Sequence, residues 1–340
     1  MPNATDAMPA FVAGQLAEHY DEPTRARIAQ GFEDACERPV TLRANALTSD
    51  ADAVAAALAR AGIGFSQPAW YPDAFVLDAT SERAAWDLDI YRDGSVYLQS
   101  LSSMVPPLIV GPRVGADVLD MCAAPGGKTS QMAALAGAAA HITACEMSAP
   151  RAEKLTHNLR KLGANNVQVM RCDARRLDEF FRFDQILVDA PCTGTGTLRA
   201  HDPKAAARIT PQLLAKTVRS QRALLDRGLT VLKPGGTLVY STCSILPEEN
   251  EQIVMEALRR HRNCELVPIA LGAADAVGAE KDTAGKPDNP QPIVLAAGSE
   301  GPFALPQLPC SMDGALAIAP TRAFEGFFVA ALRKKPGARR

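Results

Sequence analysis

Short apolar segments alternate with longer segments of helical periodicity from about residue 111 onward. The apolar segments are rich in Val, Ile, Leu and Ala, which is typical of strands buried on both faces of a sheet. We predict five such strands, at 117–121, 141–146, 167–172, 185–189 and 237–242. Regular alternation of strand and helix favours an α/β fold with a doubly wound parallel sheet, because crossovers between parallel strands are right-handed.

Helices are predicted between these strands, at 127–137, 150–162, 211–232 and 248–262. A last strand is predicted at 327–332. Residues 270–308, which precede it, are rich in Ala, Gly and Pro and show no periodicity. We therefore expect a mobile insertion in that segment.

The chain before residue 111 follows a different pattern. Apolar positions within 1–38 recur at near-helical spacing until Pro39 interrupts them, which predicts a helical packing segment. A small α+β domain follows, with one helix and three strands predicted at 40–45, 51–61, 74–77 and 95–98. We divide the chain into three parts on these grounds, at 1–38, 39–110 and 111–335.

The composition is that of a globular protein and carries no global sign of a partner. The 340 residues are 47% hydrophobic, and 36 Lys and Arg against 38 Asp and Glu leave a net charge of −2. Any contact with a nucleic acid must therefore come from a local basic patch.

The eight cysteines show no metal-binding spacing, since the nearest two, Cys172 and Cys192, are 20 residues apart. We expect no metal site and no disulfide framework. The first ten residues contain neither a basic segment nor an apolar run, and no stretch is apolar enough to span a membrane. We expect a cytoplasmic protein with no membrane partner.

A turn of small residues joins the first strand of the sheet to the first helix, and Gly126, Gly127 and Lys128 lie in it. Small residues let a ligand approach the backbone, and the free N–H groups of the helix attract negative charge. A phosphate-binding loop of the Walker type needs glycine where this chain has Cys122. A P-loop NTPase is therefore a disfavoured alternative.

The other ligand that fits is the methyl donor S-adenosyl-L-methionine. Glu146 ends the second strand, about 20 residues beyond the turn, where an acid commonly holds the ribose hydroxyls. Asp173 ends the third strand, where a carboxylate reaches the adenine edge. Each acid on its own reads equally well as a helix cap. Combined with the two glycines, they favour the methyl donor.

Two cysteines follow neighbouring buried strands. Cys192 lies in Asp189-Ala-Pro-Cys and Cys243 in Ser241-Thr-Cys-Ser. Ligands of open parallel sheets bind outside the carboxyl ends of the strands, so both thiols and the glycine turn should meet in one crevice. The other cysteines read as small buried hydrophobes, with Cys122 lining the turn.

These motifs resemble the RNA (cytosine-5)-methyltransferases, a family that includes bacterial enzymes acting on small-subunit ribosomal RNA. The resemblance rests on six segments, Arg43-Ala-Asn45, Asp120-Met-Cys-Ala-Ala-Pro-Gly-Gly-Lys128, Asp189-Ala-Pro-Cys-Thr-Gly-Thr-Gly196, Ser241-Thr-Cys-Ser244, Pro247-Glu-Glu-Asn250 and Glu325-Gly-Phe-Phe-Val329. It implies a class I methyltransferase fold, a Rossmann-like doubly wound sheet with a small N-terminal α+β domain. The 270–308 insertion departs from the family pattern.

The resemblance also implies roles for the site residues. Cys243 would be the nucleophile that adds to carbon 6 of cytosine, and Cys192 would assist release of the product. Asp189 would contact N3 and the amino edge of the base, with Lys128 orienting substrate and cofactor. The remaining cofactor contacts would come from Cys122, Ala123, Ala124, Pro125, Gly126, Gly127, Glu146, Arg151 and Asp173, together with Lys128 and Asp189. DNA enzymes use the Pro-Cys cysteine as nucleophile instead, which disfavours a DNA substrate.

Candidate RNA contacts lie in a basic segment directly after the Cys192 motif. Its main members are Arg199, Lys204, Lys216, Arg219 and Arg222. Any one of these residues is equally well explained as part of a solvated helix face. Their position beside the site favours contacts with the phosphates of RNA. Arg43 and Asn45 either extend this surface or are structural. We expect a monomer acting on ribosomal RNA, with transfer RNA as the runner-up and a non-catalytic RNA-binding factor as the rival of another class.

Overall fold

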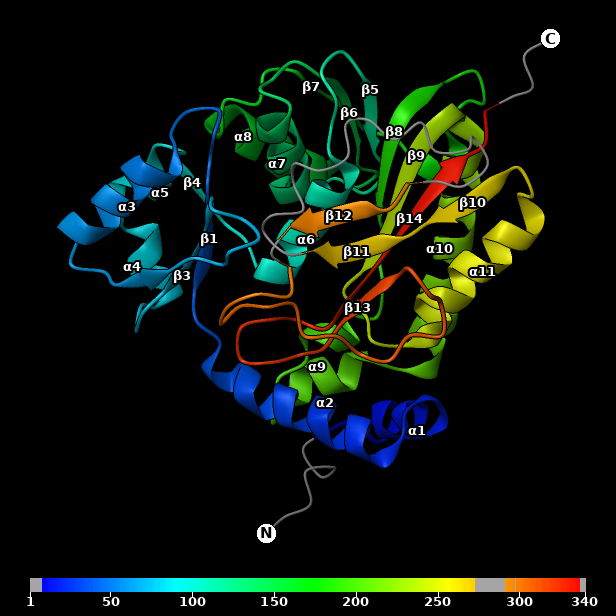
Figure 1. Cartoon of the computed structure of the whole chain (residues 1–340), viewed down its shortest axis with the longest axis horizontal. Helices are drawn as coiled ribbons and strands as arrows, with labels where there is room; N and C mark the ends of the chain where they lie inside the picture. Colours follow the sequence, from blue (N-terminus) through cyan, green and yellow to red (C-terminus); the bar gives the residue numbers. More distant parts are fainter. Residues whose placement is uncertain (1–7, 273–290, 297, 337–340) are drawn as a thin grey trace.

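The computed structural model describes residues 8–272, 291–296 and 298–336. One mixed sheet of eight strands forms the centre of the protein (Figure 1). Seven strands lie in the order β10-β14-β9-β8-β5-β6-β7, and β13 pairs with β14. Their bounds are β5 Asp117–Asp120, β6 His141–Cys145, β7 Val167–Met170, β8 Phe183–Asp189, β9 Leu232–Thr242, β10 Cys264–Val267, β13 Leu316–Ile318 and β14 Phe327–Lys334. The neighbours from β9 to β7 are parallel, whereas β14 runs antiparallel to its partners. The six predicted strands are confirmed, and β10 and β13 were not predicted.

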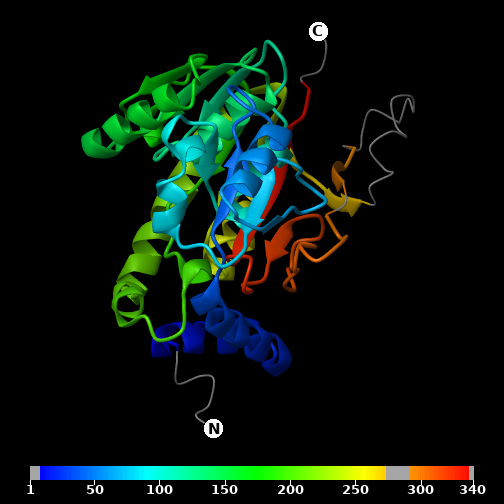
Figure 2. The ribbon, with the colours of Figure 1, turned by 90° about the vertical axis from the view of Figure 1, so that its left-hand side faces the viewer.

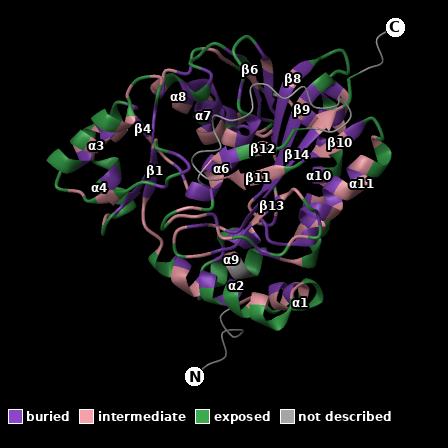
Figure 3. Cartoon of the chain, in the orientation of Figure 1, coloured by how far each residue is buried: buried purple, intermediate pink, exposed green. Residues whose placement is uncertain are grey.

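Helices cover both faces of this sheet, so its strands are buried on two sides (Figure 3). Side chains of α6, α7 and α8 form one core with one set of strand residues, and those of α10 and α11 form a second core with the alternating set. Their bounds are α6 Leu101–Val110, α7 Gly127–Leu135, α8 Ala149–Lys161, α10 Pro211–Val231 and α11 Glu251–Arg260. Two helical layers around a parallel core confirm the doubly wound arrangement.

Helix α6 was not predicted, because Pro106 and Pro107 read as breaks in the sequence. Both prolines lie inside the helix, where each removes a backbone N–H donor. The helix persists because almost all of it is buried, with Met104, Val105 and Ile109 packed in the same core as α7. Tertiary packing here outweighs the local cost of proline.

The N-terminal part contains a second, antiparallel sheet with the order β2-β3-β1-β4. It lies to the left of the main sheet in Figure 1 and in front of it in Figure 2. Its elements are β1 Thr41–Ala44, α3 Ala51–Arg60, β2 Phe65–Ser66, β3 Ala74–Leu77, α4 Glu82–Trp86, α5 Asp89–Arg92 and β4 Val96–Leu98. Alternate residues of these strands form a small core of their own with α3. This is the predicted α+β unit.

Two helices precede this sheet, α1 Ala10–His19 and α2 Glu22–Asp34. Their apolar faces pack against the two segments that follow the cysteine motifs. Leu198, after the Cys192 motif, and Ile245 and Leu246, after the Cys243 motif, lie in the same cluster. Nearby lies the short helix α9, Pro203–Arg208. The helical packing segment thus supports the loops beside the predicted site.

The segment predicted as an aperiodic insertion contains regular structure where the chain is described. Strands β11 Ile269–Gly272 and β12 Ile293–Ala296 form a parallel pair, and Trp70 Nε1 donates a hydrogen bond to the carbonyl oxygen of Phe303 at 2.8 Å. The described parts of the predicted insertion therefore include a short parallel strand pair, which the sequence pattern did not predict. Residues 273–290 of the predicted insertion lie outside the described residues. Among the residues that the structure describes, no helix combines the length and the apolar character that crossing a membrane requires.

Candidate active site

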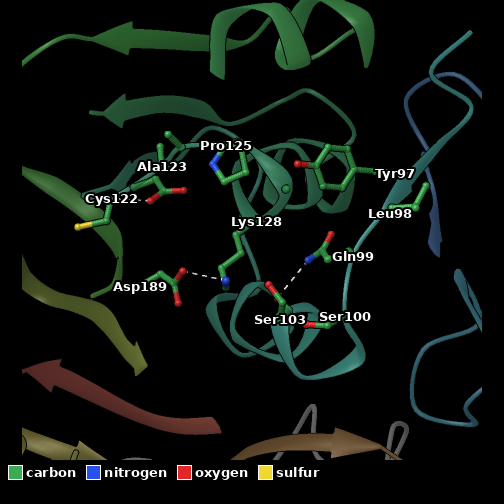
Figure 4. Close-up of a pocket in the computed structure, with 13 residues that line it drawn as sticks. Tyr97, Leu98, Gln99, Ser100, Ser103, Cys122, Ala123, Pro125, Lys128 and Asp189 are labelled. Atoms are coloured by element: carbon green, nitrogen blue, oxygen red, sulfur yellow. Dashed lines mark hydrogen bonds and ion pairs between the residues drawn. The ribbon is translucent and has the colours of Figure 1, made fainter. Parts of the chain in front are cut away.

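The turn after β5 forms the wall of a cavity of about 200 Å³ at the carboxyl end of the sheet (Figure 4). Cys122, Ala123, Ala124 and Pro125 line it together with Gly127, Lys128 and Asp189. Side chains of Tyr97, Gln99 and Ser103 close the opposite side from the small sheet and α6. We call this cavity the inner pocket.

The turn depends on its glycines and on one buried acid. Gly126 has a φ of +111°, which L side chains rarely adopt, and a Cβ on Gly127 would lie 2.7 Å from the ring of Tyr97. Asp120 accepts hydrogen bonds from Thr129 Oγ1 at 2.7 Å and from the backbone N–H of Cys122 at 3.2 Å. Burial raises the pKa of Asp120 to about 6, although the hydrogen bond from Thr129 opposes the shift. These contacts hold the turn open at the strand end.

Lys128 and Asp189 form an ion pair inside this pocket, with Nζ 2.8 Å from Oδ2. Asp189 Oδ1 accepts a hydrogen bond from Ser241 Oγ at 2.8 Å. Burial alone would lower the pKa of Lys128, but the Asp189 carboxylate and the Cys243 sulfur outweigh it, and the pKa is raised. The pocket therefore holds a permanent cation close to the Cys243 sulfur.

The two predicted cysteines lie side by side, with 3.2 Å between Cys192 Sγ and Cys243 Sγ. They come from the loops after β8 and β9, and both are partly buried. Hydrogen bonding to Cys243 and burial raise the pKa of the Cys192 thiol well above its ordinary value, and the Glu249 carboxylate contributes. Cys192 is therefore a neutral thiol at rest, able to donate to the neighbouring sulfur.

A second cavity of about 600 Å³ adjoins the first, and Cys122 lines both. We call it the outer pocket. It contains Glu146, Arg151, Asp173 and Cys192, and its outer wall is the α10 face with Lys216 and Arg219. This volume lies within the range of pockets that enclose a small ligand.

The acids of the outer pocket are held by local contacts. Glu146 Oε1 accepts the backbone N–H of Ser148 at 2.8 Å, and its other oxygen lies 3.2 Å from the Arg151 guanidinium. Asp173 accepts two side-chain hydrogen bonds from Arg175, at 2.8 and 2.7 Å. The hydrogen bonds from Arg175 lower the pKa of Asp173, so this carboxylate is charged at neutral pH.

Arg43 and Asn45 do not lie at an RNA-facing surface, because both are completely buried. Arg43 donates to Gln99 Oε1 at 3.2 Å and to Ser130 Oγ on α7 at 3.0 Å. Asn45 donates to the carbonyl oxygen of Leu162, just after α8, at 2.8 Å. The expectation of an RNA surface is corrected here, since these two side chains join the small sheet to the main domain.

The members of the predicted basic segment lie in four different places. Lys216 and Arg219 are exposed and line the outer pocket, whereas Arg199 is exposed beside a separate cavity next to the small sheet. Lys204 is exposed on α9. Arg222 is engaged within the protein, with Nε 2.8 Å from a carboxylate oxygen of Glu256 on α11. The segment is therefore not one continuous track of free cations.

Several site residues were missed by the sequence analysis. Tyr97, Gln99 and Ser103 come from the small sheet and α6, and no motif marks them. Met147 lines the outer pocket with 63% of its side chain exposed, and its position directly after Glu146 was an available signal. Glu249 is fully buried beside the Cys192 loop, and its place in the segment Pro247-Glu-Glu-Asn250 was an available signal.

A mixed sheet of this order, with ligand-sized pockets at the carboxyl ends of its parallel strands, defines the class I methyltransferase fold. The chain belongs to the family described as 16S rRNA methyltransferase RsmB/F, whose model matches residues 107–333.

Two relatives illustrate the sequence similarity. Ribosomal RNA small subunit methyltransferase F of Cronobacter sakazakii is 37% identical over 238 residues, which is 68% of this chain and 49% of that protein. The human 28S rRNA (cytosine(4447)-C(5))-methyltransferase is 36% identical over 274 residues, 77% of this chain and 32% of the human one. The chain thus spans about half the length of the bacterial relative and about a third of the human one.

Solved structures share the whole architecture. A methyltransferase homologue from Pyrococcus horikoshii is 30% identical with a TM-score of 0.70, and the match covers 98% of this chain and 99% of that one. NSun6 from the same organism, solved with SFG, has a TM-score of 0.76 at 21% identity and covers 98% and 100% of the two chains. The second likeness supports the fold alone.

Proposed function

We propose that this chain transfers a methyl group from S-adenosyl-L-methionine to carbon 5 of a cytidine in ribosomal RNA. The observation that carries the proposal is the pair of sulfurs 3.2 Å apart beside the buried ion pair of Lys128 and Asp189. The names of the relatives support the ribosomal substrate and the position of the modified atom.

The residues around the two pockets fit the methyl donor. The absence of a side chain at Gly127 lets Tyr97 pack against the turn, because a Cβ there would lie 2.7 Å from the Tyr97 ring. The outer pocket offers Glu146 for the ribose hydroxyls and Asp173 for the adenine edge, with Arg151 beside them. S-adenosyl-L-methionine supplies an electrophilic methyl group when bound. The inner pocket, between Lys128 and Tyr97, is left for the target base.

Attack would begin at Cys243. Carbon 5 of cytosine is a weak nucleophile, so a thiolate first forms a bond to carbon 6 and the displaced electron pair makes carbon 5 nucleophilic. The Lys128 ammonium interacts with Cys243, so a positive charge lies beside the attacking sulfur. Asp189 would accept a hydrogen bond from the amino group of the base, and in its protonated form it would donate one to N3, which draws charge from the ring during attack.

Release requires that the carbon 5 proton leave and that the bond between carbon 6 and sulfur break, with its electron pair returning to Cys243. We assign this step to Cys192, because its sulfur adjoins that of Cys243. A thiol held neutral at rest does not compete with Cys243 for attack. In the proposed step Cys192 passes its own proton to the departing Cys243 sulfur, 3.2 Å away, and takes the carbon 5 proton in its place.

The cellular compartment and the kind of RNA site follow from the same proposal. All eight cysteines are free thiols, which suits a reducing cytoplasmic compartment. The target cytidine must leave its stack to enter the inner pocket, which costs a few kcal/mol and is easiest in a loop or bulge. We propose that the protein acts on such a site as a monomer.

Bisulfite sequencing of ribosomal and transfer RNA, from cells with and without the gene, tests the proposal. Loss of one protected cytidine in ribosomal RNA is expected when the gene is absent. Loss confined to transfer RNA would overturn the substrate assignment. An unchanged pattern in both RNAs, with donor binding intact in the purified protein, would favour the non-catalytic RNA-binding factor.

A further inference from the structure

Two consecutive residues between β9 and α11, Glu249 and Asn250, are buried and reach toward different cysteine loops. Glu249 is 0% exposed and Asn250 is 3% exposed. Neither side chain has an assigned part in the proposed reaction. Buried polar groups are costly unless their hydrogen bonds are satisfied, so the partners of these two side chains show what they hold.

Glu249 holds the Cys192 loop on both sides of the cysteine. Its carboxylate accepts the Thr193 backbone N–H at 2.9 Å and Thr193 Oγ1 at 2.5 Å. On α10 it accepts Thr217 Oγ1 at 2.7 Å and Gln221 Nε2 at 3.0 Å. Gln221 Nε2 also donates to the carbonyl oxygen of Pro191 at 3.0 Å. Both neighbours of Cys192 are therefore tied to one carboxylate, directly or through Gln221.

Asn250 holds the Cys243 loop in the same manner. Its Oδ1 accepts a hydrogen bond from Thr242 Oγ1 at 2.5 Å, and its Nδ2 donates to the carbonyl oxygen of Ser244 at 2.9 Å. Both neighbours of Cys243 are thus tied to one amide. The donor and acceptor of Asn250 match these partners, whereas an aspartate at this position would face the Ser244 carbonyl with a second acceptor.

We propose that Glu249 and Asn250 form a clamp of positioning residues, in which Glu249 aligns Cys192 for release and Asn250 aligns Cys243 for attack. This inference rests on the proposed function and on its assignment of the two thiols. Neither residue touches the substrate. Because the two residues are adjacent in the chain, one short segment contacts both cysteine loops.

The four donors to Glu249 are neutral, so its carboxylate is buried without an ion-pair partner among them. The hydrogen bond to Cys243 and burial raise the pKa of Cys192, and the negative charge of Glu249 raises it further. All three causes favour the neutral thiol. Direct links also join the two loops, for example from the Gly196 N–H to the Cys243 carbonyl oxygen at 3.0 Å. Loss of one half of the clamp should therefore shift one sulfur rather than unfold the site.

The test compares Glu249→Ala and Asn250→Ala with Cys192→Ala and Cys243→Ala in the full chain, on ribosomal RNA from cells that lack the gene. Single-turnover methyl transfer measures attack, and decay of the covalent protein–RNA species on a denaturing gel measures release. Glu251→Gln is the matched control, because Glu251 is also a buried glutamate and contacts Ser311. Glu249→Gln and Asn250→Asp are conservative companions that decide the outcome if an alanine variant fails to fold.

Glu249→Ala is expected to slow release by about 10- to 100-fold, the usual consequence of a misplaced catalytic group, with methyl transfer nearly unchanged. Asn250→Ala is expected to slow methyl transfer by about the same factor, with release nearly unchanged. Glu251→Gln should alter neither step. Donor affinity measured by calorimetry should be the same in all variants.

Equal losses in both steps for each variant would show a purely structural role and overturn the clamp. No loss in either step would overturn it as well. These outcomes are distinct from failure of the proposed function. In that case the two cysteine variants would themselves show neither a stalled species nor a loss of attack.

Discussion

The loops that follow β8 and β9 carry the same residue type at adjacent strand ends, yet they surround their cysteines differently. Cys192 lines the outer pocket, and its pKa is raised by hydrogen bonding to Cys243 and by burial, with a contribution from Glu249. Cys243 lies close enough to the Lys128 ammonium for the two to interact, and it packs against the core formed with α6 and α7. One thiol is thus kept neutral while the other faces a cation. The charge around each thiol, rather than its residue type, thus separates a nucleophile from an assisting group.

The largest effect is expected from Cys243→Ala. Removing the nucleophile should reduce methylation by on the order of 10⁴-fold or more, because every later step depends on the first bond to carbon 6. The covalent protein–RNA species should disappear as well, and donor binding should be retained. Radiolabelled methyl transfer and a denaturing gel measure the two. Methylation at a normal rate would refute the assignment of Cys243.

A smaller but diagnostic effect is expected from Cys192→Ala. Attack and methyl transfer should persist while release slows by about 10²- to 10⁴-fold, the usual contribution of a positioned acid or base. The methylated RNA should then remain attached to Cys243 as a slowly migrating band. If that band accumulates in Cys243→Ala and not in Cys192→Ala, the two loops exchange their roles.

Glu146→Ala tests whether the outer pocket beside Cys192 holds the methyl donor. Loss of the ribose hydrogen bonds should weaken the binding of S-adenosyl-L-methionine by roughly 1–3 kcal/mol, as measured by calorimetry. RNA affinity should stay the same, which serves as the control. Tight binding of ATP by the unaltered protein, with none of the methyl donor, would restore the P-loop alternative.

The smallest effect concerns the side from which RNA approaches the two loops. Arg219 is exposed on the α10 wall of the outer pocket, whereas Arg222, one turn further along, is paired with Glu256. Arg219→Ala should lower the slope of log affinity against log salt by about 0.7, the value for one phosphate contact on a single strand. Arg222→Ala is the matched control and should leave the slope unchanged. Equal slopes for both variants and the unaltered protein would mean that RNA does not cross this wall.

Much of the fold and the outline of the site follow from local patterns. Buried parallel strands produce recognisable apolar segments, and residues at their carboxyl ends must converge because neighbouring strands end at the same edge. Cys192 and Cys243 are separated by 51 positions, and their placement at strand ends was enough to predict a shared crevice. The turn at Gly126 was predictable for a similar reason, since a strand followed by small residues and a helix leaves few other geometries.

Other features were decided only by tertiary packing. Arg43 looks the same in a short strand whether it faces water or another element, and its packing against α7, where it contacts Ser130, removes it from solvent. Helix α6 forms despite its prolines because the core on one face of the main sheet buries it. Glu249 lies in a segment that reads as a helix start, and its link to the Cys192 loop spans 56 positions of sequence. Contacts of this kind form between segments that are far apart in the sequence. The order of polar and apolar residues along the chain therefore does not show which buried polar groups will form hydrogen bonds with each other.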